Sequence, residues 1–220
     1  MGFALVAAPF LSMVLGPFGG VLLVNTLGAL TSLLILPQVF KEVDLRRVLV
    51  MLIPALVAIL LGSWVAVQVS AALLSILVGA MILVALTASV AVRTPPVILR
   101  GRFGAAAAGF VSGFMNVTAG AGGPAVAAYA QASGWPQRAF AASAQLYFLG
   151  IGAASLAAKG QLPGIDCLQW VSCGVALTAG ILLGNVLGPK IPHRFSMALV
   201  LVLALTGAVL ILAKGIAMLA

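Results

Sequence analysis

Long apolar runs, separated by short polar or charged loops, follow one another along the whole chain. A helix that crosses a membrane needs about 20 predominantly apolar residues. Runs close to this length predict spanning helices at Val21–Phe40, Val48–Val69, Ala71–Val92, Phe140–Ala158, Leu168–Leu187 and Phe195–Ala213. The pattern therefore predicts an all-α integral membrane protein, folded as a polytopic helical bundle.

Two parts of the chain break this pattern. The run Gly2–Leu15 is too short to cross a membrane and is interrupted by Pro9, so we expect it to be half of a larger element. Further along, the glycine-rich stretch Asn116–Gly123 separates the short runs Phe103–Met115 and Pro124–Ser133. Lipid cannot satisfy free backbone N–H and C=O groups, so such a break must be buried in protein or line a cavity. We therefore predict broken or re-entrant helices that meet at the membrane midplane and form a binding site.

Composition agrees with a membrane protein and excludes a soluble one. Hydrophobic residues make up 64% of the chain and charged residues 6%, with a mean hydropathy of +1.28. The net charge of +8 does not indicate a nucleic-acid partner, because the Lys and Arg residues are spread over short loops between apolar runs. The expected surroundings are a lipid bilayer, and we expect the cell inner (cytoplasmic) membrane.

The distribution of Lys and Arg also predicts orientation. Cytoplasmic loops carry an excess of these residues. If the element 103–133 returns as a hairpin, only Lys159 and Lys214 lie outside and the count is nine inside against two. If it crosses, the count is eight against three. The rule favours the hairpin, with Lys41–Arg47 and the linker 93–102 in the cytoplasm.

An internal repeat divides the chain. A shift of 122 residues lays Asp44 on Asp166 and Ile59–Ser63 on Ile181–Asn185, and a shift of about 120 lays the N-terminal run on Pro124–Ala128. We predict a first transmembrane repeat at 1–92, apparently without its first limb, a basic linker at 93–102 and a second repeat at 103–220. An odd number of crossings in each half favours inverted repeats, an arrangement that many transporters use.

The second half contains SGFMNVTAGAGGPAVAAYA, followed by WPQRAFAASAQLYF and later by LLGN. With these motifs the chain resembles the sulfite exporter TauE/SafE family of membrane transporters, most specifically over residues 109–148. The resemblance implies a permease for sulfite, thiosulfate or organosulfonates. The residues alone indicate a small-solute transporter. Another small anion such as a carboxylate, a non-transporting membrane subunit, and a homodimeric assembly stay open.

The glycine-rich break has the chemistry of an anion site. Glycines let backbone N–H groups approach a ligand, and a helix N-terminus carries partial positive charge. Neutral hydroxyl and amide donors lie nearby in the sequence. The predicted residues here are Ser112, Asn116, Thr118, Gly120, Gly122, Gly123 and Pro124. The alternative is that the glycines only permit close helix packing, the role that we predict for Gly62 and Gly184.

Two further pairs complete the predicted site. Gln145 and Tyr147 lie on the next span, where the repeat aligns them near Asn25 and Thr26. Buried amides need polar partners, so these residues are either facing walls of one cavity or partners in interhelical hydrogen bonds.

Catalysis and metal binding have no support in the sequence. The acids are Glu42, Asp44 and Asp166, all at or near loops, and the one histidine, His193, also lies in a loop. A serine nucleophile at Ser112 would lack a base. We therefore expect no enzymatic activity, no metal and no cofactor, and no proton relay through a buried acid.

Overall fold

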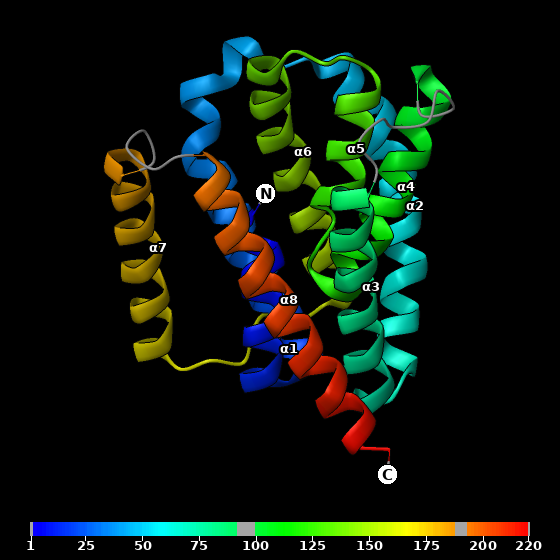
Figure 1. Ribbon diagram of the computed structural model, residues 1–220, viewed down its shortest axis with the longest axis vertical. Coiled ribbons are helices and arrows are strands. Elements are labelled where there is room, and N and C mark those ends of the chain that lie inside the picture. Colours follow the sequence, from blue (N-terminus) through cyan, green and yellow to red (C-terminus); the bar gives the residue numbers. More distant parts are fainter. Residues whose placement is uncertain (1, 92–99, 188–192, 220) are drawn as a thin grey trace.

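The computed structural model describes residues 2–91, 100–187 and 193–219, and the regular structure in these ranges is helical (Figure 1). A short 3-10 helix η1 (Phe40–Glu42) follows the first helix. The α-helices are α1 (Gly2–Val39), α2 (Leu45–Gln68), α3 (Ala71–Ala91), α4 (Gly101–Ala119), α5 (Gly123–Ala132), α6 (Gln137–Lys159), α7 (Cys167–Leu187) and α8 (His193–Ala217). The predicted all-α fold is confirmed. Residues 92–99, most of the predicted linker 93–102, lie outside the described ranges.

Membrane-spanning length is reached repeatedly in the described ranges. Five helical stretches are long and apolar enough to cross a membrane: Gly2–Glu42, Leu45–Gln68, Gln137–Lys159, Cys167–Gly184 and Ala198–Ala217. In α3 the apolar part that qualifies, Ala71–Thr87, is shorter. The chain is therefore a multi-pass membrane protein.

Helix α1 bends back on itself at Gly16. This residue has φ 77° and ψ 161°, a left-handed conformation that favours glycine. In a straight helix, residues eight apart are separated by about 12 Å, yet a Cβ placed on Gly20 would overlap the backbone of Ser12. The first arm (residues 2–15) therefore packs against the second arm (residues 17–39). The short N-terminal run is thus the first arm of a bent helix, whereas the sequence predicted it as the second limb of a broken element.

Helices α4 and α5 form a second hairpin. Gly120 ends α4 in the left-handed conformation (φ 68°), and its N–H donates to the Asn116 carbonyl over 2.9 Å. The predicted break at Asn116–Gly123 was too long, because this glycine cap lets the helix continue through Ala119. The Arg100 Nε donates to the Ala132 carbonyl over 3.1 Å, so the start of α4 lies beside the end of α5.

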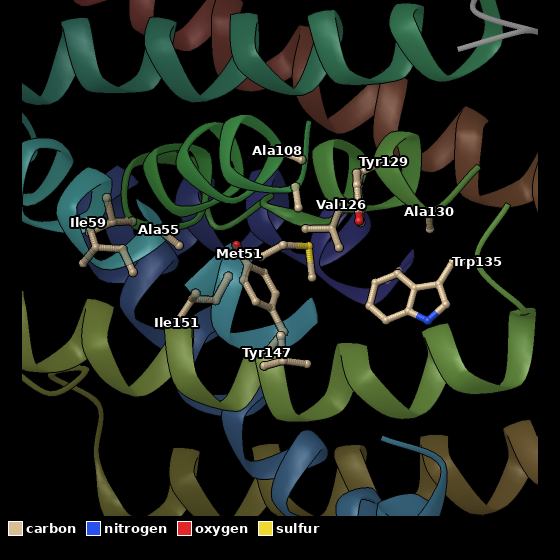
Figure 2. Close-up of a cluster of buried hydrophobic side chains, with 13 residues drawn as sticks. Met51, Ala55, Ile59, Ala108, Val126, Tyr129, Ala130, Trp135, Tyr147 and Ile151 are labelled. Atoms are coloured by element: carbon tan, nitrogen blue, oxygen red, sulfur yellow. The ribbon is translucent and has the colours of Figure 1, made fainter. Parts of the chain in front are cut away.

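Helix α2 holds this hairpin in place. A Cβ on Gly109 would overlap the backbone of Met51, and one on Gly113 would overlap the backbone of Ala55, so α2 and α4 run parallel in close contact. Gly62 packs against the Val117 side chain, which confirms its predicted packing role. Figure 2 shows the hydrophobic cluster that joins α2, α4, α5 and α6 around this seam.

Helix α7 lies at the edge of the bundle (Figure 1). Cβ atoms added to Gly174, Gly180 or Gly184 would meet no atom within 4 Å. The predicted packing role of Gly184 is therefore wrong for the described chain. The repeat matches its position to Gly62, but no helix occupies the corresponding place beside it.

Basic side chains lie at both ends of the bundle. At the end where α2 and α4 begin, Arg138 pairs with Glu42 over 3.7 Å. At the α1 bend, the Lys159 ammonium lies 4.6 Å from the centre of the Phe18 ring, and Lys214 Nζ donates to the Met13 carbonyl over 2.8 Å. Lys159 and Lys214 thus lie away from Arg138, the division expected if α4 and α5 return to the end from which they came.

Candidate functional site

A cavity of about 420 Å³ lies between α1, the α4–α5 break and α6. Its wall is mostly apolar, with a few polar side chains at defined places, as is usual in small-molecule sites. The polar side chains that line it are Asn25, Thr31, Ser32, Asn116, Gln137 and Gln145, and the α4–α5 break contributes Gly120, Gly122 and Gly123. We call this space the central cavity.

The N-terminus of α5 opens into the central cavity without a cap. Gly122 is the N-cap residue and provides no side-chain hydrogen bond. In the described part of the chain, no hydrogen bond outside the helices uses the N–H of Gly122 or Gly123. The first N–H groups of a helix lack partners within it, and together with the helix dipole they attract an anion. Pro124 removes one such N–H at no cost to the helix.

The first arm of α1 begins at the same cavity. Phe3 and Ala4 line it, and the left-handed Gly120 at the end of α4 lies close to Ala8 and Val24 of the two α1 arms. The first α1 arm therefore approaches the space into which the N-terminus of α5 opens. The positive end of the α5 dipole favours negative charge there.

The C-terminal ends of the same two helices each meet a cation. Arg100 donates to the Ala132 carbonyl at the end of α5, and Lys214 donates to the Met13 carbonyl near the end of the first α1 arm. Cations stabilise the negative end of a helix dipole. The charge arrangement thus leaves the positive end of α5 at the cavity and places a cation at the C-terminal end of each of the two helices, away from it.

Two asparagines connect the cavity walls. The Asn25 Nδ2 donates to the Asn116 carbonyl over 3.2 Å, and the Asn116 Nδ2 donates to the Ser155 Oγ over 3.1 Å. These bonds join α1, α4 and α6. Asn25 therefore lines the cavity and also bonds between helices, and so does Asn116. The Gln145 side chain faces the cavity and makes no hydrogen bond to the described residues.

The other predicted site residues do not line the central cavity. Ser112 is buried behind Gly122, because a Cβ added to Gly122 would lie 2.8 Å from the Ser112 Oγ. Thr118 donates to the Phe114 carbonyl over 2.6 Å. Thr26 donates to the Leu22 carbonyl over 2.9 Å. The Tyr147 hydroxyl donates to the Gly109 carbonyl over 3.3 Å, inside the cluster of Figure 2. Pro124 lies next to the lining in the first turn of α5.

Sequence reasoning missed several lining residues that helical spacing could have identified. Gly28 and Ser32 follow Asn25 by three and seven residues, which places them on one face of α1. Gln137 and Ala141 precede Gln145 by eight and four residues, which places them on one face of α6. Applying the 3.6-residue period to each predicted amide would have found both faces.

The lining residues show that the cavity extends toward one end of the bundle. They run along α1 from Asn25 to Ile35 and along α6 from Gly152 to Gln137. This direction leads to the end of the bundle where Arg138 and Glu42 pair. At the other end of the cavity, Gly152 packs against α1. A Cβ added to Gly152 would lie 3.3 Å from the Asn25 carbonyl oxygen and 3.3 Å from the Ala29 Cβ.

No group of three or more His, Cys, Asp or Glu side chains occurs within the described ranges. No curated protein and no solved structure matches the chain. A model of the family described as sulfite exporter TauE/SafE matches residues 1–212, which include every residue of the central cavity. The chain therefore belongs to the sulfite exporter TauE/SafE family of membrane transporters.

Proposed function

We propose that the protein is a permease that moves small sulfur-containing anions, such as sulfite, thiosulfate or organosulfonates, across the cytoplasmic membrane. The observation that carries the proposal is the uncapped N-terminus of α5 in the central cavity. Backbone N–H groups of Gly122 and Gly123 would bind the anion oxygens, and the Gln145 side chain would donate a further hydrogen bond.

The cavity suits an anion that must be released. Among the described residues no Lys or Arg lines it, so the anion would be held by the α5 N-terminus and neutral donors alone. A fixed buried cation would bind more tightly and slow release. Asn25 and Asn116 would position the wall through their bonds to each other and to Ser155. Ser112, Thr118, Thr26 and Tyr147 would act behind the wall, where they support the helices that form it.

We further propose that residues 1–92 and 103–220 are inverted repeats. Helix directions support this proposal, because α2 and its repeat counterpart α7 run in opposite directions, as do α3 and α8 (Figure 1). The contacts of Gly79 with Leu212 and of Gly215 with Ile76 agree that α3 and α8 are antiparallel. In this arrangement the first arm of α1 and the α4–α5 hairpin would be the elements that do not cross the membrane, and they would meet at the midplane.

Orientation follows from the basic loops. The central cavity leads toward the end that carries the loop Lys41–Arg47, which the positive-inside rule places in the cytoplasm. The described state would thus be open to the cytoplasm. Packing of Gly152 on Asn25, and of Gly20 on Ser12, would close the path to the other side.

A flux assay in liposomes tests the proposal. The purified protein is reconstituted, and uptake of sulfite, thiosulfate, an alkyl sulfonate and acetate is compared with uptake by protein-free liposomes. We expect saturable flux of one or more of the sulfur anions and weaker flux of acetate. Preference for acetate would favour the carboxylate alternative. Absence of flux for every anion, with folded protein in the membrane, would favour a non-transporting subunit.

A further inference from the structure

A second cavity, of about 770 Å³, lies where α2 and α4 begin and α5 ends. We call it the arginine cavity. It shares no lining residue with the central cavity. Its charged lining residues are Asp44, Arg46, Arg47, Arg100 and Arg102, and Tyr129, Gln131 and Ser133 add polar groups. The concave shape distinguishes these arginines from basic residues scattered over a loop.

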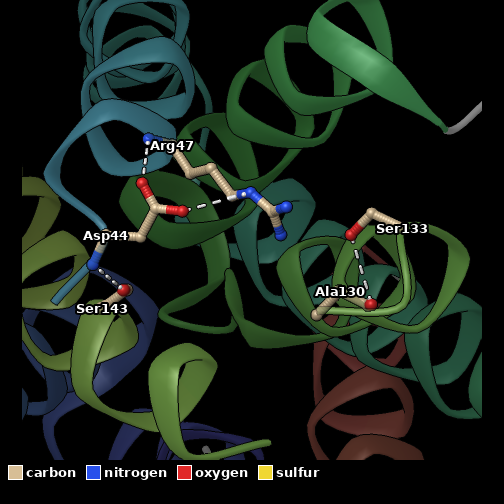
Figure 3. Close-up of polar contacts among 5 residues, drawn as sticks. All are labelled: Asp44, Arg47, Ala130, Ser133 and Ser143. Atoms are coloured by element: carbon tan, nitrogen blue, oxygen red, sulfur yellow. Dashed lines mark hydrogen bonds and ion pairs between the residues drawn. The ribbon is translucent and has the colours of Figure 1, made fainter. Parts of the chain in front are cut away.

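Arg47 is held in place with part of its guanidinium unused. Its Nε pairs with the Asp44 Oδ2 over 3.2 Å, and its guanidinium carbon lies 4.9 Å from the centre of the Trp135 ring. Figure 3 shows the side chain extending from α2 toward the last turn of α5, where Ser133 lies. The Arg47 Nη1 is buried and has no hydrogen-bond partner. A buried donor without a partner is costly, so an acceptor that reached this atom would stabilise the position.

Asp44 cannot neutralise the cavity. Its carboxylate already accepts from the Arg47 backbone N–H over 3.1 Å at the start of α2 and pairs with the Arg47 side chain. Its own N–H donates to the Ser143 Oγ over 2.8 Å, which fixes the loop against α6. Arg46, Arg100 and Arg102 form no ion pair with any described residue. The lining of the cavity therefore has an excess of positive charge.

We propose that the arginine cavity binds a phosphate group, supplied either by inorganic phosphate or by the headgroup of an anionic phospholipid. Guanidinium groups donate two parallel hydrogen bonds to phosphate oxygens, and several arginines around one space match a group that carries several such oxygens. The ligand would bridge the starts of α2 and α4 and the end of α5. Bound phosphate would thus hold the α4–α5 hairpin at its open end, outside the path of the transported anion.

Binding is measured on delipidated, purified full-length protein, so that the result does not depend on transport. One arm titrates inorganic phosphate and records thermal unfolding. The other arm measures retention of phosphatidylglycerol against phosphatidylcholine by native mass spectrometry. The test variant is Arg46→Gln with Arg102→Gln, two exposed side chains, and the matched control is Arg138→Gln, an exposed arginine outside the cavity.

We expect the double variant to weaken phosphate or phosphatidylglycerol binding about tenfold or more, because it removes charged hydrogen bonds, and Arg138→Gln to leave binding unchanged. Stabilisation by inorganic phosphate would identify the free ion. Retention of phosphatidylglycerol alone would identify the lipid headgroup. Failure of the wild-type protein to bind either, or equal binding by the double variant with an unchanged unfolding temperature, would overturn the proposal. Sulfite flux plays no part in these readings, so a failure here leaves the transport proposal intact.

Discussion

Gly28→Leu is expected to stop anion flux while the protein stays folded. Gly28 lines the central cavity, and a Cβ added there would meet no atom within 4 Å, so the larger side chain would fill the cavity without a clash at its base. Leucine also favours the helix over glycine by about 1 kcal/mol. We expect flux to fall at least about tenfold, which corresponds to roughly 1.4 kcal/mol.

Gly180→Leu is the matched control for this change. Gly180 lies on α7, where a Cβ would also meet nothing within 4 Å, and it does not line the central cavity. Both variants are reconstituted, and sulfite or thiosulfate flux is measured per folded protein. Wild-type flux through folded Gly28→Leu would show that the anion does not pass through this cavity.

Gly122→Val is expected to abolish flux by a different route. A Cβ on Gly122 would lie 2.6 Å from the Ser112 carbonyl oxygen and 3.1 Å from the Asn116 Cβ. Because the first contact is with backbone, the start of α5 must move away from α4, and the N–H groups lose their position at the cavity. Overpacking of this kind costs about 1–3 kcal/mol of stability.

Two other glycines separate the loss of the site from the loss of stability. Gly62→Val would press on the Val117 side chain in the α2–α4 seam and should lower thermal stability, with flux retained per folded protein. Gly184→Val meets no neighbour and should change neither property. If Gly122→Val transported at the rate of Gly184→Val, the role of the α5 N-terminus in binding would be refuted.

The two broken elements could be predicted from the sequence because glycine and proline interrupt apolar runs that are otherwise continuous. Their geometry could not be predicted to the residue. Gly16 and Gly120 both adopt left-handed conformations, but the sequence does not say which glycine of a cluster will do so. For this reason the predicted break included Asn116 and Thr118, which the structure places on α4.

The direction of individual side chains was harder to predict. In a helix of a soluble protein, the polar face points to solvent. These helices are apolar on most faces, so hydropathy does not show which face points to the protein interior. Gln145 and Tyr147 are two residues apart and point to different sides of α6, one to the cavity and one to Gly109. Proximity in the sequence therefore put both into one predicted site.

The arginine cavity was missed because basic residues near helix ends were interpreted only as topology signals. That interpretation counts the basic residues on each side of the membrane. It gives no information about which of these residues line one cavity. Arg47 lies in the first turn of α2 and Arg100 caps α4, far apart in the sequence, and only the contact of α2 with the α4–α5 hairpin brings them together. No local motif in the sequence records that contact.

A structure of the protein with bound selenite, the heavier analogue of sulfite, tests the anion site most directly. Anomalous scattering from selenium locates the anion independently of the surrounding side chains. We predict selenium in the central cavity, within hydrogen-bonding reach of the N–H groups of Gly122 and Gly123 and beside Gln145. Selenium found only in the arginine cavity, or bound elsewhere while the central cavity holds none, would contradict the proposal that the α5 N-terminus binds the transported anion.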